Sequence, residues 1–225
     1  MNILISGWPG AGSSTAAKIL ALTLNMKYLY GGGVLKHWAD SMGYDSKTNA
    51  INDWMEKYGD KWNSIWEKYI IEKQKQIDDT IIDAKLVGFF VEKAASVKKF
   101  YIIASNEARR NRAGSDQRLE DIEKRDDILK NSWIEKYGIN IFDTEQLKKN
   151  YDHVIDTSEI GIKEVALKLL DLITQTNYSS EIEAIMKSYE SELKFLENEL
   201  KKRSLYYAPE QVLAEILKDS RNKIG

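Results

Sequence analysis

A glycine-rich segment near the start of the chain constrains the fold more than any other feature. Residues 7–15 read Gly-Trp-Pro-Gly-Ala-Gly-Ser-Ser-Thr and match the pattern G-x-x-x-x-G-K-S/T, except that Ser13 stands in place of the lysine. The apolar residues 2–6 before it favour a buried strand, and residues 14–25 after it favour a helix. A strand, a glycine turn and a helix in this order predict an α/β fold with a phosphate site at the turn.

The backbone of this turn would hold a phosphate group without a lysine side chain. Successive N–H groups point into such a loop, the helix dipole favours an anion, and glycine permits positive φ. We expect the phosphate groups to be bound by Gly7, Gly10, Ala11, Gly12, Ser13, Ser14 and Thr15. Ser14 stands where a hydroxyl would bind Mg²⁺ directly. The alternative is a glycine-rich turn that binds no ligand, which the missing lysine favours.

The composition narrows the classes of partner. The 225-residue chain has a formal net charge of −2, so as a whole it lacks the basic surface of a nucleic-acid-binding protein. It has no cysteine and two histidines, His37 and His153, which excludes thiolate sites and disfavours zinc. No apolar stretch approaches 18 residues and the first residues lack a basic leader, so we expect a cytoplasmic protein without membrane contact.

Apolar runs alternate with helical patterns along most of the chain. Further strands are predicted at residues 27–30, 80–83, 99–104 and 153–156, and the main helices at 34–42, 51–76, 107–137 and 162–173. This alternation is typical of a parallel sheet with helices on both faces, which binds ligands at the carboxyl ends of its strands. The aromatic residues Trp54, Trp62, Trp66 and Tyr69 are spaced as a core stripe rather than a base-stacking surface.

The pattern changes after residue 178. Apolar residues then follow at spacings of 4, 3, 4, 3 and 4, namely Ile182, Met186, Tyr189, Leu193, Leu196 and Leu200. Pro209 opens a second short helix. We predict a C-terminal α-helical hairpin and a division of the chain into residues 1–177 and 178–225. The hairpin either folds back or pairs with itself, or residues 179–225 contact another subunit or a protein partner.

Arginine is concentrated in one segment. Five of the seven arginines fall within 17 residues: Arg109, Arg110, Arg112, Arg118 and Arg125. Their planar, permanently charged forks suit phosphate oxygens, and the segment follows a predicted strand at the same sheet edge as the glycine loop. Gly114 and Ser115 offer a flexible point for a closing lid. A solvated helix face with interleaved acidic residues is the alternative.

Residues 2–176 resemble the cytidylate kinases, most closely the short archaeal type within the nucleoside monophosphate kinases. The glycine loop is followed in the family's order by residues 30–36 (YGGGVLK), 83–88 (DAKLVG) and 106–112 (NEARRNR). Residues 124–126 (KRD) and 133–139 (WIEKYGI) resemble the returning lid helix, and residues 152–158 (DHVIDTS) resemble the last strand. The hairpin after residue 178 has no counterpart in the family.

The resemblance implies a P-loop kinase fold with a lid, and transfer of a phosphoryl group from ATP to CMP or dCMP. It implies that Arg109, Arg112 and Arg125 close over the transferring phosphate as the catalytic cations. Lys36 and Lys85 would stand for the arginines that bind the acceptor. Asp83 would lie beside the substrate and hold Mg²⁺ through a water molecule.

Departures from the family pattern leave two alternatives open. Lysine replaces arginine at Lys36 and Lys85, while Ser13 and Ser132 replace a lysine and an arginine. Fewer or weaker cations are consistent with a degenerate kinase fold that binds a nucleotide or a protein partner without catalysis, or with another small-molecule phosphotransferase. The retained glycines and lid arginines favour an enzyme.

Overall fold

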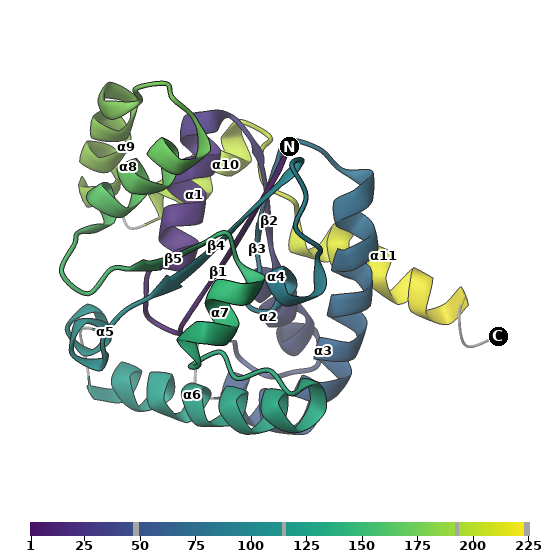
Figure 1. Cartoon of the computed structure of the whole chain (residues 1–225). Helices are drawn as coiled ribbons and strands as arrows, with labels where there is room; N and C mark the ends of the chain where they lie inside the picture. Colours follow the sequence, from purple (N-terminus) through teal and green to yellow (C-terminus); the bar gives the residue numbers. More distant parts are fainter. Residues whose placement is uncertain (47–49, 114–115, 192–193, 223–225) are drawn as a thin grey trace.

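A five-stranded sheet forms the centre of the computed structural model, which describes residues 1–46, 50–113, 116–191 and 194–222 (Figure 1). The strands lie in the order β2-β3-β1-β4-β5, and every neighbouring pair is parallel. Their bounds are β1 Asn2–Gly7, β2 Lys27–Tyr30, β3 Thr80–Asp83, β4 Val97–Ile103 and β5 His153–Asp156. The predicted parallel sheet flanked by helices is confirmed.

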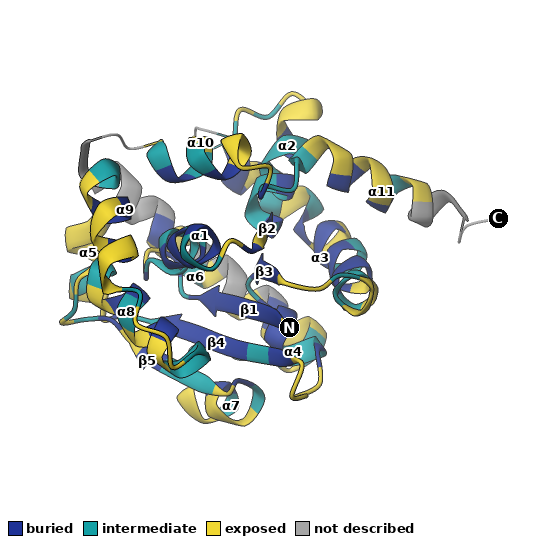
Figure 2. Cartoon of the chain, turned by 90° about the horizontal axis from the view of Figure 1, so that it is seen from above, coloured by how far each residue is buried: buried dark blue, intermediate teal, exposed yellow. Residues whose placement is uncertain are grey.

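Helices cover both faces of the sheet (Figure 2). One face carries α1 (Ser13–Leu24), α8 (Ile162–Ile173), α9 (Ser179–Ser191) and α10 (Phe195–Lys202). The other face carries, beside β2 and β3, α2 (Gly31–Ser41), α3 (Ala50–Gln76) and α11 (Pro209–Asn222). Beside β4 and β5 it carries α4 (Val87–Phe90), α6 (Asp116–Tyr137) and α7 (Thr144–Asn150). The remaining helix, α5 (Asn106–Ala113), follows β4.

The central strand is apolar on both sides because both of its faces are covered. Successive side chains of a strand point to opposite faces of the sheet. Ile3 and Ile5 therefore pack in the core between the sheet and α1 (the α1 core), while Leu4 packs in the core between the sheet and α3 (the α3 core). All three are fully buried. This two-sided burial explains why the strands appear in the sequence as short continuous apolar runs.

Among the described residues, helices α4 and α7 were not predicted, and the helix predicted at residues 107–137 is divided. The segment 107–137 forms α5 and α6, and the predicted flexible point at Gly114 and Ser115 lies outside the described residues. Helix α7 begins after Asp143, whose carboxylate accepts backbone N–H bonds from Glu145 at 2.9 Å and Gln146 at 3.3 Å. This N-cap signal is present in the sequence. The single turn α4 has no comparable local signal.

The aromatic stripe is part of the core, as predicted. Trp54, Trp62, Trp66 and Tyr69 of α3 have exposed fractions between 0% and 9%. Trp62 and Trp66 stack with their ring centroids 5.2 Å apart, and Trp54 also contacts the Trp38 ring of α2. These rings therefore hold α2 and α3 together.

The described part of the C-terminal extension, residues 178–191 and 194–222, folds back along the rest of the chain. The predicted continuous heptad helix is divided into α9 and α10, and Leu193 lies outside the described residues. Leu196 and Leu200 of the predicted seam are buried in the α1 core, and Val212 and Ile216 of α11 are buried in the α3 core. The structure thus favours the fold-back alternative, while the division at residue 178 stays a prediction. None of the described helices combines the length and hydropathy that crossing a bilayer requires.

We predict that the extension contributes to the stability of the whole fold. Leu200→Ala removes a fully buried side chain between α10 and α1, and its cavity should lower the free energy of unfolding by about 3 kcal/mol. Ile134→Ala, at a 41% exposed position of α6, is the matched control and should cost under about 1 kcal/mol. Urea unfolding measures both. Equal midpoints for the two variants would contradict the prediction.

Candidate functional site

The glycine loop between β1 and α1 has the geometry of an anion-binding turn. Gly10 has a φ of +77° and Gly12 a φ of +93°, a region in which residues with a Cβ are strained. Helix α1 begins directly afterwards at Ser13. Its first N–H groups, which include those of Ser14 and Thr15, have no partners within the helix and point toward the loop.

One member of the predicted phosphate-binding set is used differently. The Ala11 N–H donates to the Trp8 carbonyl at 3.0 Å inside the loop, and Ala11 is 2% exposed. The Ala11 amide is therefore committed to the turn itself and is not directed at a ligand. Its role is to shape the loop.

The structure brings Ser14 and Asp83 together, as the predicted magnesium pair requires. The Ser14 hydroxyl lies close enough to the Asp83 carboxylate to act on its pKa, which it lowers. The buried Tyr28 hydroxyl of β2 donates to the same carboxylate at 2.8 Å. Asp83 ends β3, beside β1 and near the start of α1, and only 5% of it is exposed.

This pair fits a magnesium ion. Mg²⁺ at phosphate-transfer sites is held by one or two protein oxygens together with phosphates and water. Burial raises the pKa of Asp83, while bonds from Ser14 and Tyr28 and the charges of Lys18 and Lys85 act to lower it. A divalent cation beside this carboxyl would further favour its ionised form.

Arg109 of α5 is buried against the loop and the lid helix α6. One guanidinium nitrogen donates to the Pro9 carbonyl at 3.1 Å and pairs with Asp126 of α6 at 2.6 Å. The other donates to Asn106 at 2.5 Å, and the guanidinium lies 5.7 Å from the centre of the Trp8 ring. Arg109 therefore ties α5 and α6 to the phosphate loop.

Arg112 makes a second tie from α5 to the loop. It donates to the Ala11 carbonyl at 3.2 Å, to the Thr157 hydroxyl at 3.0 Å and to the Thr157 carbonyl. Thr157 follows β5 and is fully buried. Both arginines therefore lie at the loop. To bind a phosphate group, each guanidinium would have to release a loop carbonyl oxygen and donate to a phosphate oxygen instead.

The other predicted cations are placed at different points. Lys85 acts by its charge on both Asp83 and Asp126, so it lies at the same sheet edge. Lys36 lies in α2, and its charge acts on Glu197 of α10. The side chains of the lid residues Arg118, Arg125 and Ser132 lie outside the described part of the structure.

Trp8 packs beside the site and anchors the loop. Its indole N–H donates to the Ile141 carbonyl at 2.7 Å, and its ring lies 5.3 Å from that of Phe142. With Arg109 over its ring, Trp8 connects the loop to the segment that precedes α7.

Sequence reasoning did not identify Lys18, Asp126, Thr157 or Glu197 as site residues. Lys18 follows Ser14 by one helical turn, which is a usable signal because residues at i and i+4 share a helix face. The other three reach the site only through tertiary contacts.

Helices α3 and α6 are in contact. Lys136 of α6 donates to the Asp60 carbonyl at 2.8 Å and to the Ser64 hydroxyl at 2.7 Å. One turn further along α3, Glu67 is 7% exposed. Burial raises the pKa of Glu67 to about 7, which Tyr137 and Lys136 oppose only in part.

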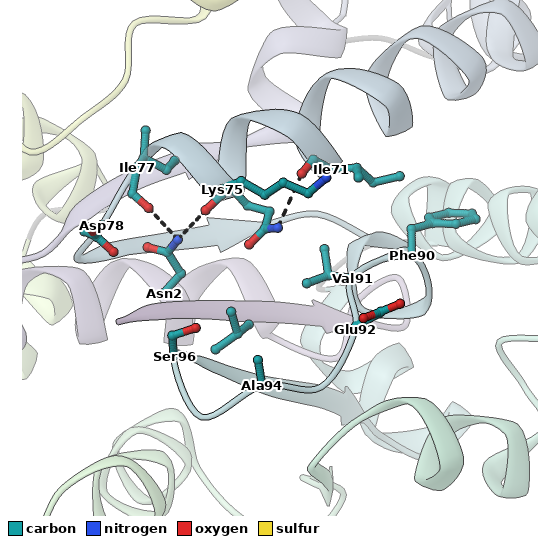
Figure 3. Close-up of a pocket in the computed structure, with 12 residues that line it drawn as sticks. Asn2, Ile71, Lys75, Ile77, Asp78, Phe90, Val91, Glu92, Ala94 and Ser96 are labelled. Carbon is teal, nitrogen blue, oxygen red and sulfur yellow. Dashed lines mark hydrogen bonds between the residues drawn. The ribbon is translucent and has the colours of Figure 1, made fainter.

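A pocket of about 500 Å³ opens at the amino-terminal ends of the strands, among the first residues of β1 and β4 (Figure 3). The Asn2 side-chain amide donates to the Gln74 carbonyl at 2.8 Å and to the Ile77 carbonyl at 2.7 Å. Phe90, Glu92 and Ser96 also line it. This pocket is separate from the predicted site, which lies at the carboxyl ends of the strands.

Several relatives are similar to this chain over most of its length. The cytidylate kinase of Sulfolobus acidocaldarius is 28% identical over 188 residues, which cover 80% of this chain and 98% of that protein. The resemblance to the cytidylate kinases is confirmed. The cytidylate kinase of Pyrobaculum islandicum is 27% identical over 177 residues, covering 76% and 91%. No family model matches the chain.

Three further comparisons concern a longer protein and two solved structures. An S-adenosylmethionine-dependent nucleotide dehydratase of Lacinutrix mariniflava is 26% identical over 187 residues, which cover 82% of this chain and 38% of that protein. Shikimate kinase from Acinetobacter baumannii has a TM-score of 0.52 at 19% identity, covering 76% of this chain and 92% of its own. Shikimate kinase from Bacteroides thetaiotaomicron has a TM-score of 0.50 at 16% identity, covering 77% and 98%. The fold of the chain is thus similar to that of these shikimate kinases.

We predict that Glu67 makes stability fall as the pH rises. Its folded pKa of about 7 exceeds the ordinary value of 4.5, so the native state binds more protons than the unfolded state between these pH values. Glu67→Gln removes the cost of burying the charge. It should stabilise the protein by about 2 to 3 kcal/mol at pH ~8, with the gain vanishing below pH ~4.5.

Urea unfolding across this pH range measures the difference between Glu67→Gln and the unaltered chain. Glu72→Gln is the control, because Glu72 is exposed on the same helix and pairs with Lys75. A stability gain of Glu67→Gln that does not change with pH would contradict the assignment.

Proposed function

We propose that the protein is a nucleoside monophosphate kinase that transfers the γ-phosphoryl group of ATP to CMP or dCMP. The position of Ser14 beside Asp83 at the glycine loop is the observation that carries this proposal, because a hydroxyl and a carboxylate there would suit magnesium and polyphosphate. The cytidylate kinases among the relatives support the choice of acceptor.

The glycine loop would bind the donor phosphates through the N–H groups at the start of α1. Ser14 would bind Mg²⁺ directly and Asp83 through a water molecule. When bound, Mg²⁺ neutralises phosphate charge and orients the oxygens around the transferring group. This role is larger here than in a loop with lysine, because Ser13 supplies no charge.

The remaining charge in the proposed reaction would come from the lid and the acceptor side. An acceptor phosphate oxygen forms a bond to the γ-phosphorus while the bond from that phosphorus to the β,γ-bridging oxygen breaks. ADP leaves, and the acceptor becomes a diphosphate. Arg109, Arg112 and Arg125 would stabilise the transferring phosphoryl group, with Lys36 and Lys85 on the acceptor.

A nucleotide-binding module without catalysis is the second candidate. It is favoured by the bonds of Arg109 and Arg112 to loop carbonyls, because an arginine held in this way is not available to phosphate. Another phosphotransferase of the same fold is the third candidate.

A coupled assay of ADP release separates these candidates. With ATP and Mg²⁺ present, CMP, dCMP, UMP and AMP are tested in turn as acceptors. We expect turnover with CMP or dCMP to exceed that with UMP and AMP. Binding of ATP without turnover on any of these acceptors would reject the proposal and leave the module, whereas turnover only with an acceptor outside this set would favour the third candidate.

We predict that Asp83→Asn lowers kcat by about 10² to 10³ by weakening charge stabilisation at the metal. Asparagine keeps the size of the side chain and an acceptor for the Tyr28 hydroxyl, so the fold should persist. Asp79→Asn is the control, because Asp79 is exposed at the opposite edge of the sheet and contacts the N-terminus. A kcat of Asp83→Asn equal to that of the control would exclude a role for this carboxylate.

A further inference from the structure

The C-terminal extension borders the acceptor side of the site. The backbone N–H of Tyr28 in β2 donates to the Leu205 carbonyl at 2.7 Å, and the Tyr207 N–H donates to the Tyr28 carbonyl at 3.0 Å. These bonds place Tyr206 beside Tyr28, with ring centroids 5.7 Å apart. The Tyr206 hydroxyl also lies close to Gly33 of α2, at 3.3 Å from the position that a Cβ would occupy there. The extension is thus attached to the edge strand whose carboxyl end leads into α2.

Lys18 of α1 lies at this same edge. Its ammonium is 5.8 Å from the centre of the ring of Tyr30, the last residue of β2, and its charge acts on Asp83. Side chains on a helix tilt toward the N-terminus, which for α1 is the glycine loop. Lys18 therefore places a positive charge one turn behind Ser14, on the side of the loop that faces α2.

Glu197 of α10 lies against this charge. Its Oε2 is 4.0 Å from the Lys18 Nζ, while its Oε1 accepts a hydrogen bond from Lys201 at 2.6 Å. Burial acts to raise the pKa of Glu197, but Lys201, Lys18 and Lys36 outweigh it and lower the pKa. The extension thus holds an ionised carboxylate beside Lys18 and near Lys36 (α10 beside α1, Figure 2).

We propose that Lys18 and Lys36 form the binding site for the acceptor's phosphate, and that Glu197 of the extension occupies this site as an internal competitor. The inference rests on the proposed function. A phosphate that approaches these lysines meets the Glu197 carboxylate, and the like charges repel. The extension therefore lowers the affinity for a charged acceptor while leaving the donor loop unaffected.

A double-mutant cycle in the full chain tests this assignment through equilibrium binding. The variants are Glu197→Gln, Lys18→Gln and the two combined, and calorimetry gives Kd for CMP, inorganic phosphate and ATP. Glu197→Gln should lower the Kd for CMP about fivefold, which is the range expected for a partly exposed charge pair. It should leave the Kd for ATP unchanged. Lys18→Gln should raise the Kd for CMP by a similar factor. In the Lys18→Gln background the effect of Glu197→Gln should shrink, because the two charges are coupled.

Glu199→Gln is the matched control, because Glu199 lies on the same helix but bonds to Arg203 at 2.7 Å. Unchanged or weaker CMP binding by Glu197→Gln, or an equal effect with and without Lys18, would overturn the inference. So would a lack of CMP and phosphate binding in both the unaltered chain and Glu197→Gln. If the expected binding pattern appears but no acceptor is turned over, the kinase proposal fails and the anion site stands.

Discussion

The pairing of β1 between β3 and β4 is the constraint on which the site depends. Parallel strands end at a common edge, so this pairing brings the glycine loop after β1, Asp83 at the end of β3 and the lid segment after β4 to one place. Ser14 at the start of α1 then lies beside Asp83 at the end of β3 and acts to lower its pKa. The proposed roles of the glycine loop, Asp83 and the lid arginines all use this alignment.

In the proposed reaction, Arg109 and Arg112 would supply charge that a loop without lysine lacks. Arg109 and Arg112 are held by loop carbonyls, by Asp126 and by Thr157, so their positions are set before a ligand binds. Donors that are already in position reduce the rearrangement that a reaction needs. The two arginines would still have to exchange their carbonyl partners for phosphate oxygens when a phosphate group binds. The same contacts therefore support both binding and a requirement for lid movement.

The extension is connected to the site as well as to the core. Leu200 and Ile216 bury it on opposite faces of the sheet, and its backbone bonds to Tyr28 attach it to β2. Glu197 then lies beside Lys18 as a consequence of this packing. The structure thus favours the fold-back alternative for this segment, and in the proposed function it would border the acceptor side.

Much of this protein was determined by local sequence. The glycine loop, the strands at Lys27–Tyr30, Thr80–Asp83 and His153–Asp156, and the aromatic stripe follow from local apolar patterns and turn chemistry, which act over a few residues. Tertiary structure alone decided that α9 and α10 are separate helices that pack on α1, and that Glu197 pairs with Lys18. The physical reason is distance along the chain. These contacts join residues far apart in sequence, and they depend on how packed helices meet rather than on any pattern within one segment.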